Sequence, residues 1–384
     1  MIPLAIPQMT GREAAYLMDC VETNFVSSVG AYVDRFEEMV AAAGGAARAI
    51  ATSAGTTGLH AALAAVGVGR DDLVILPSFT FIASANAIAQ CGADPWLFDI
   101  DPDSWTLDPV LLAAALAEAT ERQGDRLLHR ATGRRVAAIM PVYTLGMPAD
   151  MDAISAVARE HGLPVVVDGA AALGATYKGC PSGALGADLT VYSFNGNKTV
   201  TAGGGGAVAG DDADLLALVK HLTTTARVGA DYTHDRVGFN YRMTNLQAAV
   251  GCAQMESLDD FVVRKHQIAA RYNSELAVVD GLGTFPDPDW ADSACWFSGV
   301  TVDPACYGSV DTLRAALRES GIDARPFWKP VHLQAPFADA PCQDQRVSEA
   351  LWARVLTLPC STGLTDDEQS FVIETVRKLL AGAA

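Results

Sequence analysis

The sequence of 384 residues has no continuous apolar run near the roughly 18 residues that a membrane-spanning helix needs. Its first twenty residues lack the basic and apolar regions of a signal peptide. The eight cysteines form no CxxC pair and the seven histidines form no HxxxH pair, so neither a disulfide framework nor a zinc site is supported. We therefore expect a soluble cytoplasmic protein in a reducing compartment, without a bound metal.

Positive charge is scarce, because 27 Lys and Arg residues stand against 45 Asp and Glu residues, a formal net charge of −18. A nucleic-acid backbone or an anionic membrane surface is therefore not expected as the main partner. An anionic small molecule stays possible if positive groups gather in one pocket. The length suggests two domains, and half of the residues are hydrophobic, which is typical of a globular chain with a large core.

Short apolar runs alternate with helical segments such as 57–67 and 150–162 between residues 48 and 210. In the second segment Met151, Ile154 and Val157 share one face at helical spacing. Strands that are apolar almost throughout and separated by helices predict a mostly parallel sheet covered on both faces, whose ligands bind at the carboxyl ends of strands. The apolar runs are 73–81, 137–146, 163–170, 189–198 and 205–211.

The regular alternation of apolar runs and helical segments ends at about residue 245. A long helical stretch, 244–276, is expected to connect two domains, and it is followed by an SGVTV run, a helix near 309–320 and a closing helix over 365–382. We predict an N-terminal segment and large domain over 1–255 and a smaller α+β domain over 256–384.

Two stretches resemble nucleotide-binding loops, but each lacks a part of the motif that such a loop requires. GNKT (196–199) lacks the glycine that a P-loop places directly before its lysine. GGGGAVAG (203–210) fits GxGxxA only loosely, and no strand-to-helix context supports a dinucleotide site.

Three other features of the sequence, taken together, indicate a single kind of cofactor site. Asp168 ends the run PVVVD, Lys198 follows the run LTVYSFNGN, and SAGTTGLH (53–60) is expected to enter a helix. Taken singly, Asp168 reads equally well as a turn former or helix N-cap, Lys198 as a solvated turn lysine and 53–60 as an ordinary loop. Together, a carboxylate can pair with a pyridinium nitrogen, a lysine can form a Schiff base, and free N–H groups at a helix start can bind a phosphate. Pyridoxal 5′-phosphate (PLP) needs that combination.

The sequence resembles the DegT/DnrJ/EryC/StrS family of sugar aminotransferases, over nearly the whole chain. SFNGNK followed by four glycines is most similar to enzymes that act on UDP-linked 4-keto-6-deoxy-N-acetylhexosamines, as in the legionaminic acid and bacillosamine pathways, with perosamine synthases close behind. The matching stretches are MTGRE (9–13), SSVGAYVDRFE (27–37), SAGTTGLHAAL (53–63), PSFTFIASANAI (77–88), VVVDGAAALGATYKG (165–179), SFNGNKTVTAGGGG (193–206), VGFNYRMTNLQAAVG (237–251) and RPFWKPVHLQ (325–334).

The resemblance implies an α/β fold, PLP-dependent transferase fold type I, with a large domain built on a mostly parallel sheet and a smaller C-terminal α+β domain. It implies that Lys198 bonds to PLP and serves as general base and acid, and that Asp168 pairs with the pyridine nitrogen. The further cofactor contacts that it implies are Phe81 stacked on the ring, the Thr56 and Thr57 N–H groups with the Ser193 hydroxyl on the phosphate, and Asn240 from a neighbouring subunit. A homodimer with shared active sites follows. Read without the motif, Phe81 would be a core residue and Ser193 the end of a strand.

Substrate contacts are expected from Arg242 in NYRMTN and from Lys329 and His332 in FWKPVHLQ, although Arg242 reads equally well as a solvated cation at a helix start. Arg325 and Lys329 are worth testing together, because a diphosphate needs local cations in so acidic a chain.

Two departures from the family pattern stand out. Ala171 occupies the position where the family usually has Gln, Glu or His beside the phenolic oxygen of the cofactor. PVYTLG (141–146) replaces the common PVHLYG, so that Tyr143 stands for the His and Leu145 for the Tyr. Both changes bear on the sugar substrate more than on the cofactor.

We therefore expect an aminotransferase of polysaccharide biosynthesis that moves an amino group, in ping-pong fashion, from L-glutamate to a nucleotide-diphosphate-linked keto-sugar. Three alternatives remain open. They are an aminotransferase for a carbocyclic ketone, a sugar dehydratase (a branch in which histidine replaces the lysine), and a PLP-binding regulator without turnover.

Overall fold

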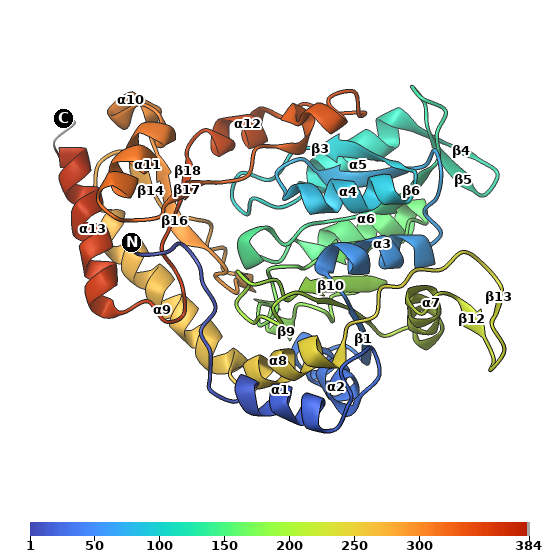
Figure 1. Ribbon diagram of the computed structural model, residues 1–384. Helices are drawn as coiled ribbons and strands as arrows, with labels where there is room; N and C mark the ends of the chain where they lie inside the picture. Colours follow the sequence, from blue (N-terminus) through green and yellow to red (C-terminus); the bar gives the residue numbers. More distant parts are fainter. Residues whose placement is uncertain (382–384) are drawn as a thin grey trace.

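Strands and helices alternate along most of the chain, and a computed structural model that describes residues 1–381 gives their arrangement (Figure 1). The longer strands are β1 (Arg48–Thr52), β2 (Leu73–Pro77), β3 (Asp94–Phe98), β4 (Thr120–Gln123), β5 (Arg126–His129), β6 (Val136–Ile139), β7 (Val166–Asp168), β10 (Leu189–Ser193), β11 (Gly206–Gly210), β16 (Ser298–Val302) and β18 (Val355–Leu358). The two-residue strands are β8 (Thr176–Tyr177), β9 (Cys180–Pro181), β12 (Arg227–Val228), β13 (Thr233–His234), β14 (Leu282–Gly283), β15 (Ala291–Asp292) and β17 (Arg325–Pro326).

The α-helices are α1 (Glu13–Glu22), α2 (Ala31–Gly44), α3 (Gly55–Ala65), α4 (Ile82–Gln90), α5 (Pro109–Ala119), α6 (Met151–His161), α7 (Ala213–Thr223), α8 (Asn245–Met255), α9 (Leu258–Leu276), α10 (Pro304–Tyr307), α11 (Val310–Glu319), α12 (Arg346–Trp352) and α13 (Asp366–Ala381). Short 3₁₀ turns lie at Thr144–Gly146, Val331–Leu333 and Ala335–Phe337. No helix within residues 1–381 combines the length and apolar character that crossing a bilayer requires.

The central sheet has the strand order β3-β2-β6 continued by β7-β10-β11-β1, with parallel bridges between Ile139 and Val165 and between Val142 and Asp168 joining the two parts. Within it, β11 alone runs antiparallel to its neighbours β10 and β1. The mostly parallel sheet predicted from the sequence is therefore confirmed. The predicted runs correspond to β2, β6, β7, β10 and β11, whereas β1 and β3 were not predicted.

Helices cover both faces of this sheet, which explains why its strands are apolar throughout. On β2, Val74 and Leu76 pack on the side of α3 and α4, while Leu73 and Ile75 pack on the side of α5 and α6. The predicted helix face of α6 is confirmed, because Met151 and Ile154 are buried in the second of these clusters.

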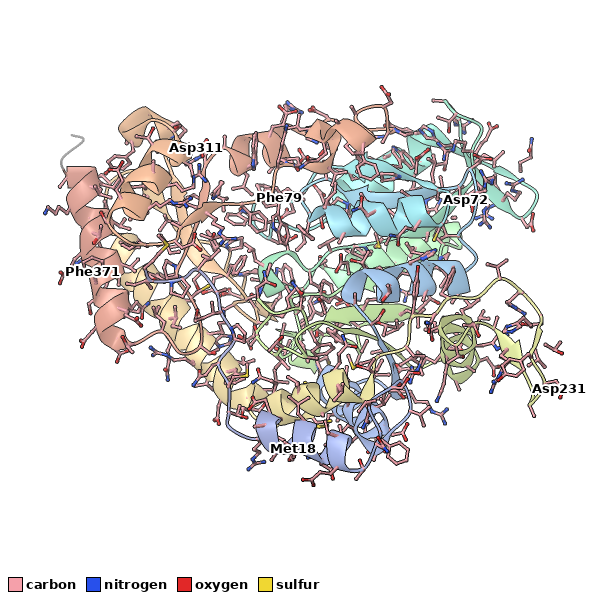
Figure 2. All side chains as sticks on the ribbon, viewed as in Figure 1. Met18, Asp72, Phe79, Asp231, Asp311 and Phe371 are labelled. Atoms are coloured by element: carbon pink, nitrogen blue, oxygen red, sulfur yellow. The ribbon has the colours of Figure 1, made fainter. Side chains whose placement is uncertain are left out.

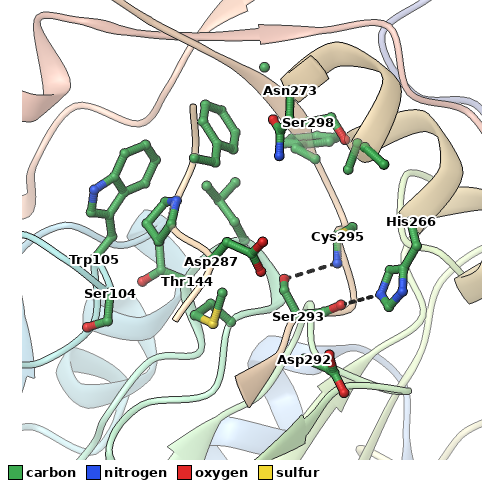
Figure 3. A pocket seen from close by; sticks show the side chains of 18 residues that line it. Ser104, Trp105, Thr144, His266, Asn273, Asp287, Asp292, Ser293, Cys295 and Ser298 are labelled. Atoms are coloured by element: carbon green, nitrogen blue, oxygen red, sulfur yellow. Dashed lines mark hydrogen bonds between the residues drawn. The ribbon is translucent and has the colours of Figure 1, made fainter. Parts of the chain in front are cut away.

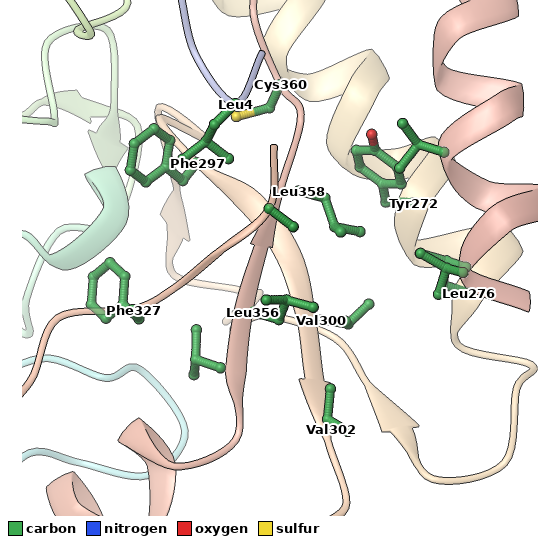
Figure 4. Close-up of a cluster of buried hydrophobic side chains, with 14 of the residues drawn as sticks. Leu4, Tyr272, Leu276, Phe297, Val300, Val302, Phe327, Leu356, Leu358 and Cys360 are labelled. Atoms are coloured by element: carbon green, nitrogen blue, oxygen red, sulfur yellow. The ribbon is translucent and has the colours of Figure 1, made fainter. Parts of the chain in front are cut away.

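The C-terminal part forms its own small antiparallel sheet in the order β14-β16-β18-β17, packed against α9, α11 and α13. Its apolar core joins Tyr272 and Leu276 of α9 to residues of β16 and β18 (Figure 4). Side chains fill the space between the layers, and Phe79 lies in the interior where the large sheet approaches this core (Figure 2).

The helix predicted over 244–276 is in fact two helices, α8 and α9, interrupted at Glu256 and Ser257. The Ser257 N–H bonds to the Gln254 carbonyl, three residues back, which tightens the last turn of α8. The Glu256 carboxylate is bound there by Arg12, Arg35 and the Tyr16 hydroxyl. The interruption is thus stabilised by the N-terminal segment, and no Pro or Gly marks it in the sequence.

The division predicted after residue 255 falls at this interruption and stays a prediction. Two contacts join residues from the two sides of this predicted boundary. Ile2 pairs with Ile322 of the C-terminal part, and the Val331 N–H donates to the Ser78 carbonyl next to the large sheet. The predicted closing helix corresponds to α13, and its predicted last residue, 382, lies outside the described residues with 383 and 384.

Candidate active site

The carboxyl ends of β7 and β10 lie side by side, because the parallel pairing sets Asp168 opposite Val191, two residues before the end of β10. Asp168 ends β7, Ser193 ends β10 and Lys198 follows in the next loop. They open into a cavity of about 540 Å³. Its wall also contains Thr56 at the start of α3, Phe81 at the start of α4, and Trp296, Arg325 and Trp328 from the C-terminal part.

Asp168 is a buried carboxylate with two donors. Its Oδ2 accepts from the Ser84 hydroxyl at 2.6 Å, and its Oδ1 accepts from the Ala170 N–H at 3.1 Å. Burial raises the pKa of Asp168 above its ordinary value, while the bonds from Ser84 and Ala170 and the charge of Lys198 oppose that rise. Each oxygen still has a free lone pair, so the carboxylate can accept from a cationic N–H group in the cavity.

Lys198 keeps part of its surface open to the cavity, yet protein atoms surround its amine. This desolvation lowers the pKa of Lys198 to about 8, against the opposing effect of Asp168. A sizeable fraction of the amine is therefore uncharged near neutral pH, as a nucleophile and general base requires.

The start of α3 offers unpaired backbone donors. Its N-cap, Ala54, has no polar side chain, and the Thr57 hydroxyl accepts from the Ala54 N–H at 3.0 Å. The N–H groups of Thr56 and Thr57 have no hydrogen-bond partner within residues 1–381. Gly55 leaves this end open, because a Cβ there would lie 2.8 Å from the Ser193 Cβ. The helix start and Ser193 thus form a site suited to an anion.

Aromatic rings also line the cavity. Phe81 is 50% exposed although it stands in a buried part of the fold, so the reading of Phe81 as a core residue is wrong. Its ring centroid lies 5.3 Å from that of Trp328. The Trp296 ring lies 3.6 Å from the Lys198 Nζ.

These residues fit PLP. A carboxylate faces the place for a ring cation, an amine of lowered pKa can bond to the aldehyde, and free N–H groups can bind the phosphate. An exposed aromatic ring is available for stacking. Within the described part of the chain, no group of three His, Cys, Asp or Glu side chains is placed to hold a metal ion.

The position of Ala171 lies in the cavity wall and supplies no polar side chain. Tyr143 also lines this cavity, although it is almost fully buried, and its hydroxyl has no hydrogen-bond partner within residues 1–381. Burial raises the pKa of this hydroxyl well above its ordinary value.

Three expected substrate contacts lie outside this cavity. The Arg242 guanidinium is bound to the Glu37 carboxylate at 2.7 Å and to the Ala51 carbonyl. The two ring nitrogens of His332 are engaged by the Ser78 hydroxyl and the Glu349 carboxylate. Lys329 is exposed and does not line the cavity. The cation that does line the cavity is Arg325, whose guanidinium also bonds to Asp323 at 2.9 Å.

Asn240 is exposed and lines a separate surface hollow with Ser28, Arg227 and Tyr232. It is not part of the Lys198 cavity of its own chain. The sequence reasoning missed Trp296 and Trp328 as cavity residues, and it missed Ser84, which is fully buried and donates to Asp168. Ser84 and Trp328 stand inside matched stretches (77–88 and 325–334), which was the available signal, whereas Trp296 stands in none.

A second cavity of about 230 Å³ lies between residues before α7 and residues from α9 onward (Figure 3). Trp105 and Thr144 line it from the first group, and His266 and Asn273 line it from α9. The buried hydroxyl of Thr144 has no partner within residues 1–381. Thr144 also lines the Lys198 cavity, so the two cavities share a wall.

The chain is similar to characterised proteins over nearly its whole length. The family model described as DegT/DnrJ/EryC1/StrS aminotransferase family matches residues 7–377. The GDP-perosamine synthase of Caulobacter vibrioides is 38% identical over 99% of this chain and 98% of that protein. A DegT/DnrJ/EryC1/StrS aminotransferase from Brucella abortus, solved as a crystal structure, is 30% identical over 96% of this chain and 95% of that chain, with a TM-score of 0.87. The structure of DesI in the presence of its TDP-sugar product is 31% identical over 99% and 93% of the two chains, with a TM-score of 0.88.

Proposed function

Because the chain belongs to the DegT/DnrJ/EryC1/StrS aminotransferase family, whose members depend on PLP, we propose that it transfers an amino group from L-glutamate to a keto-sugar attached to a nucleoside diphosphate. The observation that carries the proposal is the meeting of Asp168, Lys198 and the start of α3 around one cavity. None of these features alone indicates a transaminase, and their combination matches the three parts of PLP.

Bound PLP supplies an aldehyde that exchanges amino groups and a ring that withdraws electrons. In the proposal, Asp168 accepts the N–H of the ring cation through its free lone pairs and holds that proton in place. Ser84 and Ala170 keep the carboxylate oriented and favour its charged form. The N–H groups of Thr56 and Thr57, with Ser193, bind the phosphate, and Phe81 stacks on the ring.

Lys198 moves the proton in both half-reactions. Its uncharged Nζ would accept the proton from the α-carbon of the amino donor. The resulting ammonium group would then donate this proton to the aldehyde carbon of the cofactor. With a keto-sugar in place, the same atom moves the proton in the reverse direction. The pKa near 8 places Lys198 where both forms are populated at neutral pH.

Arg325 is the proposed contact for anionic parts of the substrates. It is the one Lys or Arg side chain besides Lys198 in the wall of this cavity, within residues 1–381. In a chain with net charge −18, a local guanidinium is needed to attract a diphosphate or the carboxylate of glutamate. Arg242, Lys329 and His332 are not proposed for this role.

Two observations bear on which nucleotide the sugar substrate carries, and they favour different nucleotides. The SFNGNK stretch with its glycines favours a UDP-linked 4-keto-6-deoxy-N-acetylhexosamine, aminated at C4. The relative named GDP-perosamine synthase, 38% identical, supports a GDP-linked sugar as a second candidate. The two candidates predict different relative rates in a panel of UDP-, GDP- and TDP-linked 4-keto sugars.

A homodimer with shared active sites completes the proposal. Asn240 and Tyr232 lie on an exposed part of the surface, and Tyr232 is 87% exposed. Because Asn240 does not line the cavity of its own chain, the proposed phosphate contact requires a partner subunit. The presence of Lys198 argues against the dehydratase alternative, in which histidine takes that place. The carbocyclic ketone and the regulator remain alternatives.

The experiment that tests the proposal is the visible absorption spectrum of the purified protein with PLP, before and after addition of L-glutamate. We expect a coloured band that glutamate removes, and release of 2-oxoglutarate when keto-sugar is also present. Lys198→Ala should lose the band while the protein stays folded. A band that glutamate leaves unchanged would reject glutamate as donor, and no band at all would overturn the assignment of Asp168 and Lys198. Turnover with glutamate and a carbocyclic ketone, but with no nucleotide sugar, would favour the carbocyclic alternative.

A further inference from the structure

The Lys198 amine lies against the face of an indole ring that comes from the C-terminal part of the chain. Its Nζ is 3.6 Å from the centroid of Trp296, a residue that precedes β16 by two positions. No other tryptophan ring within residues 1–381 has a cation over its face. The ring is 2% exposed, so water competes little for the ammonium group on this side.

The position of the Trp296 ring is fixed relative to the lysine. Its indole N–H donates to the Asn197 carbonyl at 2.7 Å, and Asn197 directly precedes Lys198. The adjacent Phe297 ring stacks on it with a centroid distance of 3.8 Å. A buried indole N–H needs an acceptor, and because the acceptor here directly precedes Lys198, the ring and the lysine are fixed relative to each other.

The backbone of Trp296 is held by a second buried lysine. Lys265 of α9, which is 2% exposed, donates to the Trp296 carbonyl at 2.8 Å and to the Cys360 carbonyl at 2.6 Å. The Trp296 N–H donates to the Leu145 carbonyl of the large domain. The indole is thus placed by contacts from the part of the chain before α7 and from α9.

An aromatic face suits a lysine that must alternate between two protonation states. A carboxylate at this distance would bind the ammonium group strongly and hold its proton. An indole face attracts the ammonium group more weakly and offers no atom that takes its proton. The titratable or charged side chains that line the same cavity are Tyr143, Asp168 and Arg325. In the proposed function, Asp168 is engaged by the ring cation of PLP, which leaves Trp296 as the neighbour that favours charged Lys198.

We propose that the indole face of Trp296 receives the Lys198 side chain as an ammonium ion in those steps in which that side chain is protonated and not bonded to the cofactor. Trp296 is then a positioning residue for the catalytic lysine, and Lys265 positions Trp296. This inference rests on the proposed function, because it takes Lys198 as the residue that bonds to PLP.

The test weakens the electrostatic attraction of the ring without changing its size. The protein is produced with 5-fluorotryptophan in place of tryptophan, the PLP is removed, and the rate of recombination with PLP is followed by visible absorbance as a function of pH. Only uncharged Lys198 combines with PLP, so the midpoint of the profile reports its protonation. We expect fluorination to lower the midpoint by about 0.3 pH unit, a fraction of the shift that a whole cation–π contact produces.

The matched control is Trp296→Phe, produced with and without 5-fluorotryptophan at the remaining tryptophans. In this variant we expect no shift on fluorination. A midpoint that does not move in the fluorinated wild-type chain, or that moves equally in the Trp296→Phe protein, overturns the inference while the proposed function stands. If Trp296→Phe does not fold, Trp328→Phe replaces it as a control that must retain the shift. Failure of the unlabelled wild-type chain to form a coloured band, with Lys198→Ala as the blank, overturns both.

Discussion

Asp168 and Lys198 are both removed from water, and in each residue the pKa moves in the direction that favours the neutral form. Burial raises the pKa of Asp168 and lowers that of Lys198 to about 8. A site prepared in this way favours a ligand that brings its own positive charge next to Asp168, because that charge restores the ionised carboxylate. The uncharged amine is then free for chemistry.

Ser84 is the residue through which this balance can be tested. Removing its hydroxyl in Ser84→Ala takes away the 2.6 Å bond to Asp168 and raises the pKa of that carboxyl further. A hydrogen bond to a charged group contributes about 1.5–3 kcal/mol, so we expect the affinity for PLP to fall about tenfold or more. The measurement is a titration of apoprotein with PLP at pH 7 and pH 9. Because higher pH ionises the carboxyl again, the loss should be smaller at pH 9, and an equal loss at both values would contradict the reason given.

The sequence could predict those site residues whose role follows from strand ends and motif order. Asp168, Lys198, Thr56, Ser193 and Phe81 all lie around one cavity. It could not reveal which cations are already engaged. Arg242 is bound to Glu37, 205 positions away in the chain, and such pairing depends on the packing of α2 against the rest of the fold.

Among the elements, α8 is packed closely on α2, and Gly251 of α8 leaves room for Phe36 of α2. A Cβ at Gly251 would lie 2.5 Å from the Phe36 ring, which is fully buried and packs edge-on against Phe194 at 4.7 Å. We expect Gly251→Ala to lower the free energy of unfolding by about 1–2 kcal/mol, because overpacking outweighs the better helix propensity of alanine. Denaturant unfolding measures the change. The double variant Gly251→Ala with Phe36→Leu should lose less than the sum of the single changes, and stabilisation by Gly251→Ala alone would refute this account.

Glu13 of α1 holds the N-terminal segment against α8. Its carboxylate accepts from the Thr10 and Gly11 N–H groups, both at 2.9 Å, and from the Gln254 amide at 2.5 Å. Burial alone would raise its pKa, but the hydrogen bonds from Thr10 and Gln254 outweigh that effect and lower it to about 2. A lowered pKa in the folded state means that the stabilisation is complete above the ordinary value near 4.5 and is lost as the pH falls toward 2.

We therefore expect Glu13→Gln to destabilise the protein by up to about 3 kcal/mol at pH 7, and the difference from the wild type to shrink between pH 4.5 and pH 2. Urea unfolding at a series of pH values measures it. Glu22, exposed at the other end of α1, provides the control, since Glu22→Gln should leave stability unchanged over that range. A difference that persists at pH 2 would assign the effect to lost packing.

The sequence predicted several of the strands and helices, but it did not predict where the long helix is interrupted. Strands whose residues are all apolar were found, whereas β1 and β3 begin with Arg48 and with Asp94 followed by proline, and their apolar parts are too short to stand out. The interruption between α8 and α9 depends on Glu256 binding groups more than 200 positions away. A pattern of neighbouring residues contains no information on such contacts.

In the whole molecule, the cavity is built where the large sheet and the C-terminal part meet. Lys198 and Asp168 come from the sheet, while Trp296, Arg325 and Trp328 come from beyond α9. The N-terminal residues, which pair with Ile322, and the segment around Val331, which bonds to Ser78, tie the two parts together. Changes in their relative position would therefore alter the wall around Lys198 directly.

If the active sites are shared between subunits, two inactive variants should restore activity when they form mixed dimers. Lys198→Ala removes the catalytic amine, and Asn240→Asp places a negative charge at the proposed phosphate contact in the partner's site, so each variant alone should be almost inactive. Unfolding and refolding them together forms mixed dimers, in which one of the two sites combines intact Lys198 with intact Asn240 from the other subunit. Random pairing then restores about a quarter of the wild-type activity, measured as 2-oxoglutarate released per chain. Refolding either variant alone is the control. If the mixture stays inactive although mixed dimers form, Asn240 acts within its own chain or not at all.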